Sequence, residues 1–240
     1  MRVLVTGGSR GIGLALCRRF LEMGCEVVTL ARSPSGEVHS LRSKYGRSFV
    51  FLEMDLGKGD LVGRFNKADE LLRAFDVVVF NAAIERSELL ANTSERQLRD
   101  CIEVNLISTI QVSQCCLRRC LAEGVASSFV YISSVAAFRG LRGLGVYGAT
   151  KAALSAFARG LAVEYGERNI RANVVVPGYV DGGMATQLPP EVRHRVVRRT
   201  PTNRVASIRD VVGVVAFLAG KESGHINGEE LRVDGGYLIS

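Results

Sequence analysis

Short runs of β-branched and other apolar residues alternate along this chain with longer segments whose apolar residues recur at helical spacing. Strand-like runs occupy Arg2–Thr6, Glu26–Ala31, Ser48–Met54, Asp76–Phe80 and Ser127–Ile132, and helical spacing occupies Leu14–Met23, Gly57–Phe75 and Thr93–Leu121, the last with Thr93 or Ser94 as its N-cap. Near-continuous apolar strands that alternate with helices are typical of a parallel sheet covered on both faces. We therefore predict an α/β fold whose ligands bind where the strands end.

The composition suits one sizeable globular unit. The chain has 240 residues, of which 47% are hydrophobic and 23% charged, so a single domain, 1–240, can bury a large core. It has no run of about eighteen apolar residues. Its first residues enter a strand-like pattern without the layout of a signal peptide. We expect a cytoplasmic protein that does not bind or span a membrane.

The charge and the cysteines narrow the range of partners. A formal net charge of +7 favours anionic partners such as a phosphorylated cofactor, a coenzyme A ester or an acidic carrier protein. The basic residues form short scattered groups without a nucleic-acid-binding motif, so we expect no nucleic acid partner. The six cysteines form no CxxC pair and no metal spacing with histidine. We expect most of them to be reduced and buried, and we expect no metal.

A glycine-rich loop, Gly7-Gly8-Ser9-Arg10-Gly11-Ile12-Gly13, joins the first strand to the first helix. Glycines let the backbone approach a pyrophosphate, and the free N–H groups at the start of a helix can hold it. The spacing differs from the commoner G-x-G-x-x-G, and a glycine turn can be only a turn, but its place directly after the first strand favours dinucleotide binding.

The end of the second strand indicates which dinucleotide binds. Leu30-Ala31-Arg32-Ser33 contains no acidic residue that could hold a ribose 2′-hydroxyl. Arg32, together with Arg10, could pair with a 2′-phosphate, so we predict NADP(H) as the cofactor. The alternative is that both arginines are solvated surface residues.

Tyr147 and Lys151 are four residues apart, which places them one turn apart on one face of a helix. A nearby ammonium favours the phenolate, so this spacing predicts a lowered tyrosine pKa, toward the range of a general acid. The alternative is a lysine that extends past a half-buried tyrosine. Asp55, after the third strand, could meet an adenine ring, and Asn105, within a predicted helix, needs a hydrogen-bond partner if it is buried.

Taken in order, these residues resemble those of a classical short-chain dehydrogenase/reductase, from Thr6 to Gly236. The matching features are Thr6-Gly7-x-x-x-Gly11-x-Gly13, Asp55, Asn81-Ala82, Asn105, Ser134, Tyr147, Lys151, Pro177-Gly178 and the ending Gly228 through Val233-Asp234-Gly235-Gly236. The resemblance implies a doubly wound Rossmann sheet of about seven parallel strands with helices on both faces. Within the family the chain is most similar to the 3-oxoacyl-[acyl-carrier-protein] reductases, through Ser9-Arg10, Arg168-Asn169-Ile170 and its compact length.

The resemblance also implies roles for individual residues. Tyr147 would donate a proton to the substrate oxygen while the nicotinamide delivers hydride, and Ser134 would hydrogen-bond the same oxygen. Lys151 would hold the nicotinamide ribose and lower the tyrosine pKa, and Asn105 would connect Lys151 to solvent through a backbone bend and a water. The implied catalytic residues are Asn105, Ser134, Tyr147 and Lys151. The implied cofactor-binding residues are Gly7, Ser9, Arg10, Gly11, Ile12, Gly13, Arg32, Asp55, Leu56, Asn81, Ala82, Tyr147, Lys151, Pro177, Gly178 and Val180.

Three positions depart from the family pattern. Ala83 replaces a usual glycine, Phe80 replaces a frequent asparagine, and Gly182 stands where a threonine commonly contacts the cofactor. We expect Gly182-Gly183 to weaken cofactor affinity or to loosen the substrate lid, which we place at about 181–200. The lid is expected to be helical, with Met184, Leu188, Val192, Val196 and Val197 among basic residues.

The apolar lid favours a hydrophobic or acyl substrate, and the resemblance favours a 3-oxoacyl thioester linked to acyl carrier protein or coenzyme A. Arg118, Arg119 and Arg168 could form a basic ledge for an acidic carrier protein, or they could be solvated helix-end residues. The family implies a homotetramer or dimer, and Ala153, Ala156, Phe157 and Gly160 are compatible with such packing. Other functions stay open: a ketoreductase, broad carbonyl reductase or alcohol dehydrogenase of another pathway, and a non-catalytic nucleotide-binding regulator.

Overall fold

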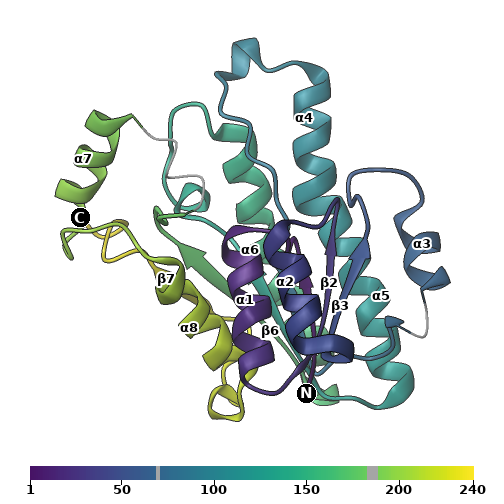
Figure 1. The fold of residues 1–240 in the computed structure, drawn as a ribbon. Helices are drawn as coiled ribbons and strands as arrows, with labels where there is room; N and C mark the ends of the chain where they lie inside the picture. Colours follow the sequence, from purple (N-terminus) through teal and green to yellow (C-terminus); the bar gives the residue numbers. More distant parts are fainter. Residues whose placement is uncertain (69–70, 183–188) are drawn as a thin grey trace.

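The computed structural model describes residues 1–68, 71–182 and 189–240 (Figure 1). Within these residues, seven parallel strands form one sheet in the order β3-β2-β1-β4-β5-β6-β7. The strands are β1 (Arg2–Thr6), β2 (Glu26–Ala31), β3 (Phe49–Glu53), β4 (Val77–Phe80), β5 (Ser127–Ile132), β6 (Ile170–Pro177) and β7 (Glu230–Val233). The strand order turns around at β1 and β4, so the predicted doubly wound parallel sheet is confirmed, with its crevice at the ends of these two strands.

Helices cover both faces of this sheet because the side chains of each strand alternate between two cores. The helices are α1 (Gly11–Glu22), α2 (Gly36–Tyr45), α3 (Leu61–Lys67), α4 (Glu95–Ile102), α5 (Ser108–Glu123), α6 (Gly145–Tyr165), α7 (Pro190–Arg199) and α8 (Ile208–Ala219). Val3 and Val5 face α1, α2 and α8, whereas Leu4 faces α3, α5 and α6. Figure 1 shows the first group of helices together on one side of the sheet.

The helix predicted over Gly57–Phe75 is mostly wrong. Among the described residues of this range, the α-helix is α3, Leu61–Lys67, and the Asp60 carboxylate accepts a hydrogen bond from the Gly63 amide at its start. Leu72 and Phe75 are fully buried, so the apolar residues that resembled a longer helix belong partly to an irregular segment. Two helices had no prediction, α2 and α8. In α2 only Val38 and Leu41 are buried, which leaves little periodic signal.

The long helix predicted over Thr93–Leu121 is present but has a bulge in its middle. Ser94 is the N-cap, and it forms a capping box with Gln97. The chain then continues through α4, a π-helical segment at Glu103–Ile107 and α5. Such wide turns often occur at functional positions, and this one contains Asn105.

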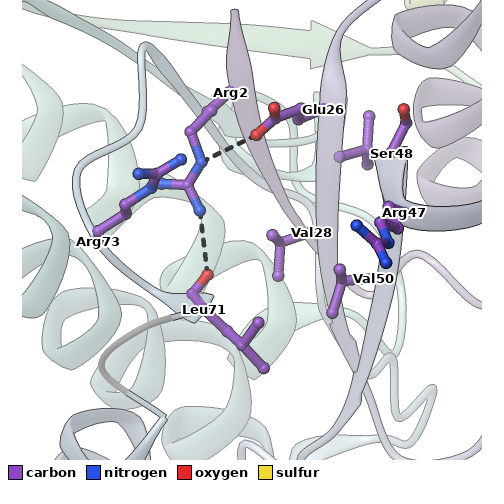
Figure 2. Close-up of a pocket in the computed structure, with 9 residues that line it drawn as sticks. Arg2, Glu26, Val28, Arg47, Ser48, Val50, Leu71 and Arg73 are labelled. Atoms are coloured by element: carbon purple, nitrogen blue, oxygen red, sulfur yellow. Dashed lines mark hydrogen bonds and ion pairs between the residues drawn. The ribbon is translucent and has the colours of Figure 1, made fainter.

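A pocket of about 190 Å³ lies at the opposite end of the sheet, where β1, β2 and β3 begin. Figure 2 shows Arg2 bridging it: Nε lies 3.3 Å from the Glu26 carboxylate, and an Nη donates to the Leu71 carbonyl at 3.4 Å. A further Nη donates to the Ala74 carbonyl at 2.9 Å. Arg2 therefore fastens the starts of the strands to the following chain, and none of the predicted site residues lines this pocket.

Two further observations concern composition. The six cysteines are free and buried, as expected. No helix within the described ranges is long and apolar enough to cross a bilayer.

Candidate active site

The glycine loop forms a backbone cradle between β1 and α1. Gly7 and Gly11 have positive φ angles of 74° and 56°, which side chains other than glycine rarely adopt. A Cβ atom at Gly13 would lie 2.2 Å from the Gly7 carbonyl oxygen, so the helix can only approach the loop this closely with glycine at that position. Arg10, the N-cap of α1, provides no side-chain hydrogen bond to the helix start, which leaves the first amides for a ligand.

Thr6 and Asn81 hold this cradle in place. The Asn81 side-chain amide donates to the Thr6 and Gly7 carbonyls at 3.1 and 3.2 Å. The backbone amides of Asn81 and Ala82 both donate to Thr6 Oγ1 at 3.0 Å. Because Thr6 ends β1 and Asn81 follows β4, the two strands are connected at the crevice where the strand order turns around.

Arg10, before α1, and Arg32, directly after β2, are exposed. Across the ranges 1–68, 71–182 and 189–240, neither forms an ion pair. Asp55 interacts within its own turn: its carboxylate accepts a hydrogen bond from the Gly57 amide at 3.0 Å and lies 3.8 Å from the Lys58 ammonium. The neighbouring Leu56 is buried in the core.

Tyr147 and Lys151 lie on the first two turns of α6, on a buried face. Their exposed fractions are only 4% and 2%, so the alternative of a lysine that extends into solvent is wrong. The Lys151 ammonium lies 5.7 Å from the centre of the Tyr147 ring and donates to the Ile132 carbonyl, at the end of β5, at 2.7 Å. Burial lowers the pKa of Lys151 to about 8.

The prediction of a lowered tyrosine pKa is wrong for this chain. The pKa of Tyr147 is raised, because burial disfavours the phenolate and the Glu85 carboxylate repels it, while a hydrogen bond with Ser134 acts in the opposite direction. The Lys151 ammonium points at a carbonyl and does not outweigh burial. A raised pKa keeps the phenol protonated at neutral pH, as a proton donor requires.

Ser133 and Ser134 have different partners, as their alternation along the chain predicts. Ser133 is buried, and its hydroxyl donates to the Lys151 carbonyl at 3.0 Å. Ser134 is partly exposed, and its hydroxyl accepts from the Ala136 amide at 3.2 Å and bonds with Tyr147. Ser134 therefore faces the same space as the Tyr147 phenol, whereas Ser133 fixes α6 to the end of β5.

Asn105 is completely buried in the π-helical segment, and both the oxygen and the nitrogen of its side-chain amide form hydrogen bonds. Its Oδ1 accepts from the Ile84 amide at 2.8 Å, and its Nδ2 donates to the Ile84 carbonyl at 2.9 Å and to Thr150 Oγ1 at 3.2 Å. Thr150 Oγ1 in turn donates to the Tyr147 carbonyl at 2.7 Å. The structure thus connects all four of the implied catalytic residues through direct contacts or one intermediate side chain.

The other wall of the site begins where β6 ends. Pro177 is buried at the end of β6, and Gly178 packs so closely on Asp234 that a Cβ atom would lie 2.9 Å from its Cα. Val180 forms an isolated parallel bridge with Ala206. The Gly182 carbonyl lies 3.8 Å from where a Cβ would stand on Gly11, so the loop after β6 faces the glycine cradle across a narrow gap.

Part of the expected lid is helical. The Asp181 carboxylate accepts two hydrogen bonds from Arg193 of α7, at 2.5 and 2.9 Å, and this pairing lowers the pKa of Asp181. Arg199, at the end of α7, donates to the Ser240 carbonyl at 2.7 Å. Figure 1 shows the C-terminus beside α7. Gly183, Met184 and Leu188 lie outside the described residues.

These residues fit a nicotinamide dinucleotide. The cradle offers helix amides that the N-cap side chain leaves unbonded and two glycines in the left-handed region, and Arg10 and Arg32 have no acidic partner among the described residues. No cluster of metal-ligating side chains occurs among the residues that the structure describes.

Comparison with known proteins agrees with this geometry. A family model described as enoyl-(acyl carrier protein) reductase matches residues 7–238. The chain belongs to the short-chain dehydrogenase/reductase family; it is an oxidoreductase and uses a nicotinamide cofactor.

Individual relatives are similar to this chain over nearly its full length. The chain is 33% identical over 237 residues to the 3-oxoacyl-[acyl-carrier-protein] reductase of Chlamydia muridarum, covering 97% of this chain and 95% of that protein. Among solved structures, a proposed NAD(P)-dependent gluconate 5-dehydrogenase of Beutenbergia cavernae, with NADP bound at low occupancy, is 32% identical with a TM-score of 0.90, covering 100% of this chain and 97% of that one. A family oxidoreductase of Burkholderia thailandensis is 30% identical with a TM-score of 0.88, covering 100% and 93%.

Two of the residues that hold the site together, Ile84 and Thr150, had no prediction from the sequence. Both act through hydrogen bonds with Asn105, which lies in a distant segment of the chain. Glu85, which raises the pKa of Tyr147, also went unnoticed. Its position just after the segment that follows β4, at the carboxyl edge of the sheet, is the signal that could have identified it.

Proposed function

We propose that this chain reduces the ketone of a 3-oxoacyl thioester to the 3-hydroxyacyl form, using NADPH. The observation that carries the proposal is the buried Tyr147 phenol, which is protonated at neutral pH and bonded to the partly exposed Ser134 hydroxyl. A protonated donor beside a second donor suits a carbonyl oxygen that gains negative charge.

When bound, the nicotinamide supplies the hydride that adds to the carbonyl carbon. Tyr147 donates its proton to the carbonyl oxygen, and Ser134 hydrogen-bonds that oxygen as charge develops. Each such donor contributes about 3 kcal/mol of transition-state stabilisation. Glu85 disfavours the phenolate, and this makes the Tyr147 proton harder to lose to solvent before a substrate accepts it.

Lys151 and Asn105 support this proton transfer. Lys151, with a pKa of about 8, can exchange protons near neutral pH and bind the nicotinamide ribose. The π-helical turn at Asn105 widens the backbone beside α6, where a water can connect Lys151 to solvent and restore the proton that Tyr147 gives up.

The preference for NADPH over NADH rests on Arg10 and Arg32. Arg10 is the N-cap of α1, Arg32 directly follows β2, and neither has an acidic partner in the described part of the chain. A 2′-phosphate would supply one. The Beutenbergia cavernae structure with NADP bound supports this choice. The remaining cofactor contacts in the proposal are those of the glycine cradle, Asp55, Leu56, Asn81, Ala82, Pro177, Gly178 and the Val180 backbone.

The thioester substrate is supported by the Chlamydia muridarum relative and by the apolar residues in the sequence of the expected lid. A carrier-linked substrate would place the reaction in fatty acid synthesis. Of the arginines expected to form a carrier-binding ledge, Arg119 stacks on Phe65 at 4.7 Å, and Arg168 precedes β6, at the edge of the sheet where strands begin. The ledge is therefore not part of the wall that surrounds Tyr147.

We further propose a cytoplasmic homo-oligomer, tetramer or dimer, assembled partly through α6. Ala156, Gly160 and Val163 are exposed on this helix, the last to 85%, whereas Phe157 packs edge-on against Tyr131 inside the fold. Small exposed residues such as Ala156 and Gly160 permit close contact between helices. The molecular mass in solution tests the proposed oligomeric state.

The experiment that tests the main proposal follows NADPH absorbance with acetoacetyl-CoA and a panel of ketones. We expect turnover with the thioester, and Tyr147→Phe is expected to abolish it while NADPH affinity changes less than about fivefold. NADPH binding without turnover of any carbonyl would favour a nucleotide-binding regulator instead. In parallel, tighter binding of NADH than NADPH would exclude the roles given to Arg10 and Arg32.

A second candidate function is oxidation or reduction of a sugar acid or other alcohol. The 32% identity to the proposed gluconate 5-dehydrogenase favours it. The same panel, extended with 5-ketogluconate, separates the two: a kcat/KM higher for the sugar acid than for acetoacetyl-CoA would select the second candidate.

A further inference from the structure

Thr150 occupies a fully enclosed position between the two halves of the site. Its exposed fraction is 3%, and that of Asn105 is 0%. It lies on α6, three residues after Tyr147 and one before Lys151, on the side that packs against α4 and the π-helical segment. Neither the cofactor contacts nor the proton transfer described above uses its side chain.

The Thr150 hydroxyl both accepts and donates a hydrogen bond. It accepts a hydrogen bond from Asn105 Nδ2 at 3.2 Å and donates its own proton to the Tyr147 carbonyl at 2.7 Å. Asn105 Nδ2 has two N–H groups, and Ile84 O and Thr150 Oγ1 are its two oxygen acceptors. The Cys101 thiol, at 3.4 Å, is a weaker additional acceptor.

This arrangement fixes α6 at a second point. Ser133 already connects the Lys151 carbonyl to the end of β5, and Thr150 connects the Tyr147 carbonyl to the wide turn around Asn105. Two separate connections fix both the position of the first turns of α6 along the helix axis and their rotation about it. The Tyr147 phenol and the Lys151 ammonium project from those turns, so small shifts there move both reacting groups.

We propose that Thr150 is a positioning residue, whose hydroxyl holds the Tyr147 and Lys151 turn in register with Asn105 so that the proton given up by Tyr147 is efficiently replaced. The inference rests on the proposed reductase function. A hydroxyl is required because no apolar side chain can accept from Asn105 and donate to Tyr147 at once.

Two comparisons isolate the hydroxyl. The first compares wild type with Thr150→Val, which keeps the shape of the side chain and removes the hydroxyl. The second compares Thr150→Ser with Thr150→Ala; these two variants both lack the methyl group and differ only in the hydroxyl, so they stay informative if the valine variant does not fold. Each protein is assayed for kcat, KM, NADPH dissociation constant and thermal unfolding.

We expect Thr150→Val and Thr150→Ala to lower kcat by about tenfold or more, equivalent to 1.36 kcal/mol or more, with NADPH affinity within about threefold of wild type. Thr150→Ser should recover most of the rate. The alkaline limb of the kcat against pH profile should move to lower pH in the two variants without the hydroxyl, because proton replacement fails first where protons are scarce. A defect of folding alone would lower kcat by one factor at every pH.

Hydrogen exchange provides a readout that needs no turnover. Amides of residues 147–154 should exchange faster in Thr150→Val than in Thr150→Ser or wild type. Equal exchange, a rate in Thr150→Val above half that of wild type, or an unshifted pH profile would each overturn the inference. If wild type reduces no carbonyl while exchange differs as expected, the proposed function fails and the positioning role of Thr150 stands.

Discussion

The buried ammonium of Lys151 should destabilise the fold at neutral pH, and its replacement by methionine should reveal this cost. Lys151 is 2% exposed, has a single hydrogen bond to a backbone carbonyl, and has no carboxylate beside it in the described structure. Methionine has a similar length and no charge. Lys151→Met should therefore abolish turnover without weakening the fold at pH 7, as is common when a residue is kept for function at the expense of stability.

The magnitude follows from the pKa of Lys151. A fall from 10.5 to about 8 corresponds to roughly 3 kcal/mol of destabilisation while the group is charged in both the folded and the unfolded chain. Against this, methionine leaves the Ile132 carbonyl without its donor, which costs about 1–3 kcal/mol. The two effects nearly cancel at pH 7, so the pH dependence is the decisive measurement.

The sign of that dependence is fixed by which state binds more protons. Between about pH 8 and pH 10.5 the folded chain has lost the Lys151 proton and the unfolded chain has not, so stability rises with pH through this window. From pH 7 to pH 10, wild type should gain roughly 2.5 kcal/mol relative to Lys151→Met. Below about pH 7, where Lys151 is charged in both states, the difference between the two proteins should be constant.

Urea unfolding followed by circular dichroism, at several pH values between 7 and 10, measures this difference directly. The other titrating groups are common to both proteins and cancel in the comparison. Lys58→Met is the matched control, because the Lys58 side chain is 82% exposed and its removal should leave the pH dependence unchanged. A wild-type minus Lys151→Met difference that does not vary with pH would refute the reasoning.

Three further predictions concern the walls of the site. Glu85→Gln should lower the pKa of Tyr147, because the carboxylate raises it; the pH above which the hydroxy product is oxidised should then fall, and an unchanged kcat/KM profile would contradict this. Gly13→Ala should cost about 1–3 kcal/mol in urea unfolding and abolish NADPH binding, since its Cβ would lie 2.2 Å from a carbonyl, whereas Gly36→Ala, with no atom within 4 Å, should do neither. Asp181→Ala removes the ion pair that holds α7, so KM for long acyl thioesters should rise several-fold with NADPH affinity unchanged; equal KM values would assign the pair to the fold alone.

The central strands were predictable because burial on both faces demands continuous apolar runs. The run at Asp76–Phe80 became β4, Val77–Phe80, and Glu26–Ala31 matched β2 in full. Helices were less predictable where glycine or polar residues interrupt the pattern. The first helix begins at Gly11 rather than Leu14, because its first turn contains two glycines of the cradle, Gly11 and Gly13, which contribute nothing to an apolar pattern.

The chemistry of the site was only partly readable from the sequence. Tyr147, Lys151 and the glycines have recognisable spacing because the reaction needs them close together. The pKa of Tyr147 depends instead on burial, which no four-residue spacing reports. Likewise, Thr6 and Asn81 are 75 positions apart, and their hydrogen bonds exist only after β1 and β4 pair.

The buried cysteines make local unfolding of this protein measurable by thiol labelling. The thiols sample several regions: Cys17 lies on α1, Cys25 directly precedes β2, Cys101 lies beside Asn105, and Cys115, Cys116 and Cys120 lie on α5. A thiol reagent can react only with molecules in which that region has opened, so the labelling rate of each cysteine measures the free energy of a local unfolding event. Without any added probe, mass spectrometry of timed labelling would show whether the Asn105 region opens before the core beneath α5 or only together with it.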